Sequence, residues 1–318
     1  MSQSQPSTEP VMAGSPYLDD DADIVLRSTD AVHFHVHKLL LSKCSPVFAD
    51  LFSMPQPKSW GEKLTKGEHP VVQMAEDQHA LRLLLGFCYP TGAASFRTLS
   101  DIRIALDLTK KYQMSGTWEC LTSLLLGHVY TEPESVLAIA WIFEMKDLAV
   151  AAAKQTLEKP WLEDPTPVEF DYAPATAMHK LLQYQRSCRA AALVIVSNVH
   201  TWLGKEDVNS HPVINSDRYY DCSCTVSKAE FVRIGISPTR WLVSFQDKAC
   251  STLEKKLTGA AVRAPMIQTT SIAEAASPSC KRCSSRLPEI VLALEHVSGR
   301  LAAAVDAKVA TVQLKTPF

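Results

Sequence analysis

Four cysteines in the second half of the chain lie in two closely spaced pairs, and paired thiolates are typical ligands of a metal ion. The pairs are Cys222-x-Cys224 and Cys280-x-x-Cys283, and both occur in polar stretches between predicted helices. The second pair has the tight spacing of a tetrahedral zinc site. The first pair has only one intervening residue, and about 55 residues separate the pairs, whereas a zinc ribbon separates its pairs by about 15–20. Two interpretations stay open: a structural zinc site formed by two loops, and thiols that are free or transiently disulfide-bonded.

Other residues that could do chemistry do not form a catalytic constellation. Cys188 and Cys250 lie at apolar positions of predicted helices, where cysteine usually acts as a small hydrophobic residue. The sequence has no G-x-S-x-G, P-loop, G-x-G-x-x-G or H-E-x-x-H pattern, and its 11 glycines make a phosphate-binding loop a poor prediction. We therefore expect a protein that is not an enzyme and that has no cofactor other than the zinc ion considered above.

The composition is that of a soluble globular protein with room for two domains. The 318 residues are 46% hydrophobic and 21% charged, with a formal net charge of −2, so no global charge favours nucleic acid. The longest apolar run, 190–196, is far shorter than the ~18 residues of a membrane span, and no signal peptide is visible. An odd number of cysteines, nine, favours reduced thiols. We expect an intracellular protein, cytoplasmic or nuclear, that does not bind membranes.

Residues 23–52 predict a short hairpin that leads directly into two helices. In the segment 32–36, apolar residues alternate with two histidines, which is typical of a strand with one apolar face. The period changes to that of a helix at His37. Ser45 followed by Pro46 then indicates a second helix, because a hydroxyl caps a helix N-terminus and proline is favoured at the first helical position.

The same residues resemble the opening of a BTB/POZ domain. The matching string is Asp23-Ile24 … Phe34-x-Val36-His37-Lys38-x-x-Leu41-x-x-x-Ser45-Pro46-x-Phe48-x-x-x-Phe52. Later landmarks follow in the family's order: Val71-Val72-Gln73-Met74, Asp77, Leu84-x-x-Phe87-Cys88-Tyr89-Pro90-Thr91-Gly92, and Ala105 to Tyr112-Gln113-Met114. The resemblance covers residues 19–130 and implies an α+β fold, in which a short β-sheet is flanked by α-helices.

The resemblance implies a homodimer formed through the first strand and the first helices. In this family an acidic and a basic residue line a charged pocket near the dimer interface, and Asp23 and Lys38 occupy the matching positions, with His37 as a hydrogen-bonded packing residue between them. Charges that are partly removed from water are tolerated when they are paired. The alternative is an exposed ion pair worth about 0–1 kcal/mol.

A long polar loop, 53–70, contains Trp60-Gly61-Glu62. Family members that recruit a cullin-3 ubiquitin ligase often carry a hydrophobic-x-Glu motif in this loop, and they also use a helical pair like the one predicted at 133–158. The resemblance therefore allows a substrate adaptor of a cullin-3 ligase, with Trp60 and Glu62 in the contact. The alternative is that Trp60 packs on its own domain.

We expect four segments in the chain. Residues 1–18 predict a disordered tail, 19–130 the BTB/POZ domain, 131–160 a BACK-like helical extension, and 161–318 a mainly helical C-terminal domain with cysteine-bearing loops. A cluster of prolines from Pro160 to Pro174 indicates the last boundary. Both halves resemble a BTB group that is expanded in mushroom-forming fungi. The predicted function is a homodimeric scaffold or adaptor for protein–protein interaction, and the alternative to adaptor function is a metal- or redox-responsive protein that uses the four paired cysteines.

Overall fold

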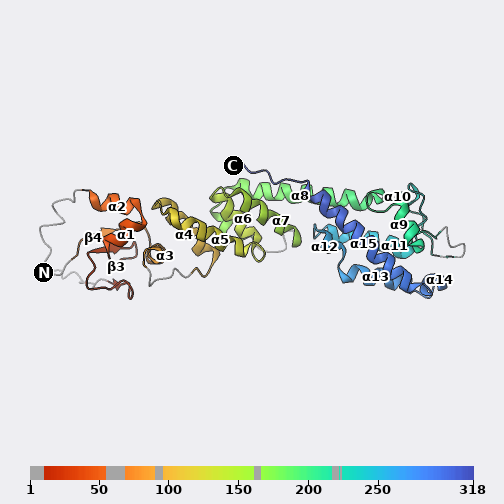
Figure 1. Ribbon diagram of the computed structural model, residues 1–318, viewed down its shortest axis with the longest axis horizontal. Helices are drawn as coiled ribbons and strands as arrows, with labels where there is room; N and C mark the ends of the chain where they lie inside the picture. The colour runs from red at the N-terminus through yellow and green to blue at the C-terminus, as the bar shows by residue number, and fades with distance from the viewer. Residues whose placement is uncertain (1–10, 55–68, 90–95, 161–165, 217–221, 223) are drawn as a thin grey trace, which may run out of the picture. The chain divides into compact units, whose positions relative to one another are not determined.

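The computed structural model describes residues 11–54, 69–89, 96–160, 166–216, 222 and 224–318. The chain divides into two compact units, Met1–His128 and Val129–Phe318. The first unit combines a small sheet with helices, and the second is mainly helical (Figure 1).

The first unit is built around a four-stranded mixed sheet. Its strands are β1 (Val11–Met12), β2 (Ile24–Arg27), β3 (Val32–Val36) and β4 (Val71–Gln73), in the order β1-β3-β2-β4. The predicted hairpin is the antiparallel pair β2 and β3, in which Leu26 lies opposite Phe34. The strands β1 and β4 pair in parallel with β3 and β2. Leu26 and Phe34 are fully buried, as the alternating pattern predicts.

Helices flank this sheet, and three of them have a side-chain cap at the N-terminus. The helices are α1 (Lys38–Cys44), α2 (Pro46–Ser53), α3 (Gln78–Cys88), α4 (Leu99–Lys111), the 3₁₀ turn η2 (Ser115–Thr117) and α5 (Trp118–His128). The Ser45 hydroxyl accepts a hydrogen bond from the Phe48 amide, Asp77 caps α3, and Thr98 forms a capping box with Asp101. The predicted α+β class, a short β-sheet flanked by α-helices, is confirmed for this unit.

The predicted disordered tail is wrong from residue 11 onward. Val11 and Met12 form a strand on β3, and the Tyr17 ring is buried against Phe34 and Tyr89, with both centroid distances at 5.5 Å. The polar composition of the first residues hid these contacts, because two apolar residues and one aromatic ring suffice when a sheet edge and a core are present to receive them.

The second unit consists mainly of helices. They are α6 (Pro133–Ile142), α7 (Lys146–Gln155), η3 (Thr156–Glu158), η4 (Val168–Asp171), α8 (Ala175–Ser197), η5 (Val199–Thr201), α9 (Lys205–Ser210), η6 (Pro212–Ile214), α10 (Ala229–Val232), α11 (Arg240–Leu253), α12 (Gly259–Val262), α13 (Pro265–Ala275), α14 (Lys281–Ser284) and α15 (Leu287–Ala310). The long helices α8 and α15 pack against each other, and α11 packs against α8 and α13. Trp202 and Trp241 are almost fully buried in this unit.

One expectation about this region differs from the structure. The prolines from Pro160 to Pro174 do not separate compact units, because the helices α6 and α7 belong to the same unit as α8 to α15. The Gln185 amide donates to the Thr156 hydroxyl at 3.0 Å across the supposed boundary. Proline marks a break in secondary structure, and tertiary contacts decide whether that break is also a domain boundary.

Within the described residues, no helix has both the length and the apolar character needed to cross a membrane.

Candidate functional site

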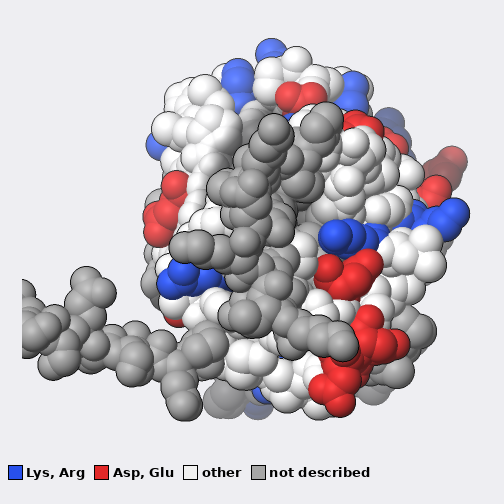
Figure 2. Space-filling view, turned by 90° about the vertical axis from the view of Figure 1, so that its left-hand side faces the viewer, with Lys and Arg blue, Asp and Glu red and all other residues white. Residues whose placement is uncertain are grey.

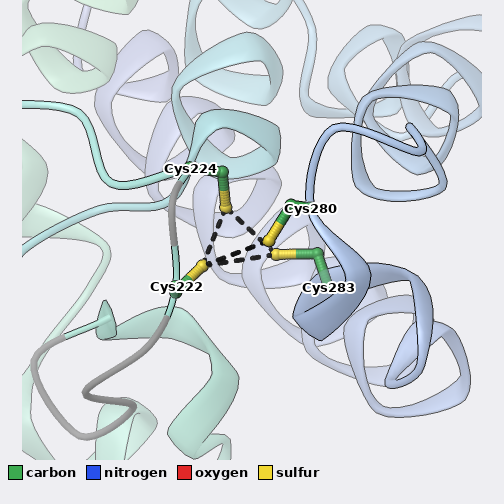
Figure 3. Close-up of side chains that lie close together, drawn as sticks. All are labelled: Cys222, Cys224, Cys280 and Cys283. Atoms are coloured by element: carbon green, nitrogen blue, oxygen red, sulfur yellow. Dashed lines mark hydrogen bonds between the residues drawn. The ribbon is translucent and has the colours of Figure 1, made fainter.

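The four paired cysteines meet in the second unit, with their side chains directed toward one another (Figure 3). All four sulfur atoms lie within 4.8 Å of one another. The Sγ–Sγ distances are 2.9 Å from Cys222 to Cys224, 3.1 Å from Cys224 to Cys283, and 3.7 Å from Cys222 to both Cys280 and Cys283. A disulfide bond is about 2.05 Å long, so these are four free thiols in contact.

Backbone pairing holds the first cysteine pair against the start of α11. The Arg240 amide donates to the Cys224 carbonyl at 2.9 Å, and Thr225 forms an isolated β-bridge with Thr239. The second pair comes from the start of α14, where Cys280 is the N-cap and Cys283 lies in the helix. Because α14 packs against α15, both pairs are anchored to long helices of the unit.

The thiols of the cluster differ in acidity. Burial acts to raise the pKa of Cys280, but hydrogen bonds from the Cys283 amide and from the neighbouring thiols outweigh it and bring the pKa to about 6. Burial raises the pKa of Cys224 to about 11 and raises that of Cys283 further. One thiolate next to buried thiols is an arrangement that can accept a cation.

Of the predicted pocket residues of the first unit, Asp23 and Lys38 are joined by a hydrogen bond, whereas His37 bonds to other residues. Asp23 is exposed, and its carboxylate accepts a hydrogen bond from the backbone amide of Lys38, the first residue of α1, at 2.8 Å. The His37 ring lies 3.1 Å from the Tyr89 hydroxyl and 3.2 Å from an Asp21 carboxylate oxygen. The Asp23 carboxylate thus contacts the backbone of Lys38. It supplies a hydrogen-bond acceptor at the N-terminus of α1, where His37 provides no side-chain cap.

Two buried carboxylates were not found by the sequence reasoning. Glu76 is only 8% exposed, and its carboxylate contacts the Lys111 ammonium and accepts a hydrogen bond from the Tyr112 hydroxyl at 2.9 Å. In the second unit Asp207 lies 2.7 Å from the His296 ring. Lys111 is 35 residues from Glu76 and His296 is 89 residues from Asp207, so no local spacing signals these side-chain pairs.

Trp60 and Glu62 lie outside the described residues. The helical pair predicted at 133–158 corresponds to α6 and α7, and Trp141 of α6 is buried.

Comparison with known proteins assigns one part of the chain to a family. No curated protein matches the sequence. Residues 18–129, which contain β2 to β4 and the flanking helices α1 to α5, match the family model of the BTB/POZ domain, and this part of the chain is therefore a BTB domain.

Proposed function

We propose that the protein is a protein–protein interaction module that forms a homodimeric scaffold or adaptor through its BTB domain. The BTB domain is an interaction domain and not a catalytic one, and such domains generally mediate self-association and the binding of other proteins. The match of residues 18–129 to this domain is the observation that carries the proposal.

Exposed apolar side chains around the first strand and the first helix support self-association. Val11 is 61% exposed, Leu39 is 67% exposed, and Met12 and Leu18 are also exposed. Large apolar residues gathered on a surface are typical of an interface. Figure 2 shows Lys and Arg side chains beside Asp and Glu side chains on the face that it presents, so no single sign of charge dominates that face. We infer that β1 and α1 meet the same elements of a second copy, and that Asp23, His37 and Lys38 line the polar edge of this interface.

Light scattering on the full chain tests this proposal. We expect the mass of a dimer for the wild type and the mass of a monomer for the double variant Met12→Lys with Leu39→Lys, because two ammonium groups would be placed in an apolar contact. The matched control is Leu292→Lys, which changes an exposed leucine of the second unit and should leave the dimer intact. A wild-type monomer at micromolar concentration would refute the dimer.

Adaptor function for a cullin-3 ubiquitin ligase is the more specific proposal. It assigns Trp60, Glu62 and the α6–α7 pair to the ligase contact. Co-purification of a cullin with the wild-type chain, and its loss in the double variant Trp60→Ala with Glu62→Ala, would support this role. Recovery of the same amount of cullin with the double variant would exclude the loop from the contact.

The cysteine cluster favours a second candidate function, a response to metal supply or to oxidants. Thiols that touch one another can bind a metal ion or be oxidised in pairs. If the cluster has this function, partner binding by the full chain should change when a peroxide oxidises the cysteines and should recover after reduction by a dithiol. Partner binding that peroxide leaves unchanged would exclude the response.

The similarity of the chain to the fungal BTB group stays a prediction.

A further inference from the structure

We propose that Cys222, Cys224, Cys280 and Cys283 together bind one Zn²⁺ ion as a closed structural centre of the second unit. This inference goes beyond the interaction function and does not depend on whether the BTB domain dimerises.

The donor set selects the class of metal. Four sulfur ligands in a tetrahedral arrangement are typical of zinc or iron, whereas calcium and magnesium require oxygen ligands. A site with four protein ligands has no open position for a substrate, which is the arrangement of structural zinc sites. All four sulfurs lie within 4.8 Å of one another, which fits one central ion better than a two-iron cluster, in which two metal ions hold the pairs of thiolates further apart.

The distances between the sulfur atoms are close to those of such a site. With Zn–S bonds of about 2.3 Å, the edge of a regular tetrahedron of sulfurs is about 3.8 Å. The distances from Cys222 to Cys280 and to Cys283 are both 3.7 Å. The two shorter distances, 2.9 Å and 3.1 Å, both involve Cys224 and would lengthen by less than about 1 Å on metal binding. Cys222 is only half-buried, so its side chain can lengthen the distance to Cys224 without displacing the core, whereas the distance between Cys224 and Cys283 requires a small shift of two buried side chains.

The surroundings suit the charge of the centre. Four thiolates with one Zn²⁺ carry a net charge of −2, and a buried charge requires compensation. The cavity beside Cys222 and Cys283 is lined by Arg282 and by Arg286, whose guanidinium also pairs with Glu289, and no carboxylate is among its described lining residues. Lys281 also lies within the second cysteine pair.

Apolar side chains complete the enclosure. Val213, Trp241 and Ile290 line the same small cavity, and each is at least nine-tenths buried. An apolar shell limits the access of water and of competing ligands to a metal ion. The donors therefore lie in a built site, held by η6, α11, α14 and α15.

A zinc ion here would join segments that are far apart in the chain. Cys222 is 58 residues from Cys280 and 61 residues from Cys283. Since the unfolded chain does not hold these four thiolates together, the binding free energy of the metal contributes to folding. The centre thus fixes the connection that precedes α10 to the start of α14.

Metal analysis of the full chain tests the proposal. We expect one zinc per chain after purification under reducing conditions, and less than about 0.1 in the double variant Cys280→Ser with Cys283→Ser, because two remaining thiolates do not hold a structural zinc ion. Cys120→Ser and Cys250→Ser are the matched controls, since neither thiol belongs to the cluster, and both should keep the full zinc content.

A second measurement covers the case in which the double variant does not fold. Wild-type protein in which Co²⁺ replaces zinc should show the intense visible bands of tetrahedral cobalt and thiolate-to-cobalt charge transfer in the near ultraviolet. A thiol-blocking mercurial should release one zinc per chain as it titrates the cluster. Three results would each overturn the proposal. They are wild-type protein that contains no metal after zinc supplementation, wild-type protein that contains iron in place of zinc, and a folded double variant that retains zinc.

Discussion

Glu76 shows how one carboxylate connects distant parts of the BTB domain. It follows β4, and its side chain meets Lys111 and Tyr112 at the end of α4. The Thr29 amide donates to its backbone carbonyl at 2.8 Å, so the same residue also holds the turn between β2 and β3. Burial and the neighbouring Glu76 carboxylate raise the pKa of Tyr112, which keeps its hydroxyl protonated as the donor.

Substitution of Glu76 tests this role. Glu76→Gln removes the charge that contacts Lys111 and leaves a buried amide in its place, so we expect the free energy of unfolding of the full chain to fall by about 1–3 kcal/mol. Lys111 is half exposed and can turn toward water, which favours the lower part of this range. Urea unfolding measures the change. Glu119→Gln, on the exposed surface of α5, is the control, and an equal effect of both substitutions would contradict the role of Glu76.

Asp101 makes stability depend on pH. Burial acts to raise the pKa of Asp101, but hydrogen bonds from the Arg97 amide, the His79 ring and both the amide and the hydroxyl of Thr98 hold it below its usual value of 3.8. A folded-state pKa below the unfolded value contributes stability that is present above the unfolded pKa and is lost as the pH falls through the folded one.

We therefore expect the wild-type chain to lose stability below about pH 4 in part through Asp101, and Asp101→Asn to show a weaker dependence on pH in this range. Near pH 7 the variant should be less stable than the wild type, because the asparagine forms weaker hydrogen bonds with these donors. Thermal unfolding at a series of pH values measures both effects. Parallel curves for the two proteins would show that the pKa of Asp101 does not contribute.

Among the helices of the second unit, the start of α12 lies very close to the backbone of α15. The Gly259 amide, at the start of α12, donates to an Asp306 carboxylate oxygen of α15 at 2.6 Å. A Cβ atom at Gly259 would lie 2.5 Å from the Ala302 carbonyl oxygen, which belongs to the α15 backbone. The absence of a side chain at this position allows the two helices to meet.

Gly259→Ala and Gly299→Ala form a matched pair that tests this contact. We expect Gly259→Ala to lower the free energy of unfolding by about 1–3 kcal/mol, because the backbone of α15 or of α12 must shift. A Cβ atom at Gly299, within α15, meets nothing within 4 Å, so Gly299→Ala should stabilise the helix by up to about 1 kcal/mol. Unfolding in urea measures both changes, and the same sign for the two substitutions would contradict the packing argument.

At the scale of the whole molecule, each of the two units has its own core. The BTB core contains Phe34, Phe48 and Leu84, and the core of the second unit contains Trp202, Trp241 and Phe245. The proposed zinc centre lies entirely in the second unit. Removal of the metal should therefore act on one unit alone.

Calorimetry of the full chain tests this separation. After zinc is removed by a chelator under reducing conditions, we expect the transition of the second unit to move to lower temperature by more than about 5 °C, while that of the BTB domain stays in place. Addition of zinc should return the transition of the second unit to its original temperature. A shift of both transitions would show that the metal does not act on the second unit alone, and an unchanged thermogram would show that the centre does not stabilise it.

The BTB domain was predictable from its resemblance to a known family, because the motifs that carry this resemblance are local. Alternation in 32–36, the hydroxyl of Ser45 before Pro46 and the later landmarks each act within a few residues, and the structure has β3, α2 and α3 where they predict them. The spacing of the second cysteine pair allowed a zinc site, with free or transiently disulfide-bonded thiols as the alternative.

Which distant residues meet depends on tertiary packing. It added β1 to the sheet, brought Glu76 to Lys111, kept the proline cluster within one compact unit, and placed Cys222 and Cys224 beside Cys280 and Cys283. These contacts join residues that are about 20 to 60 positions apart, and the free energy that closes such loops comes from the packing of whole helices and strands. The spacing of residues along the chain therefore does not contain them.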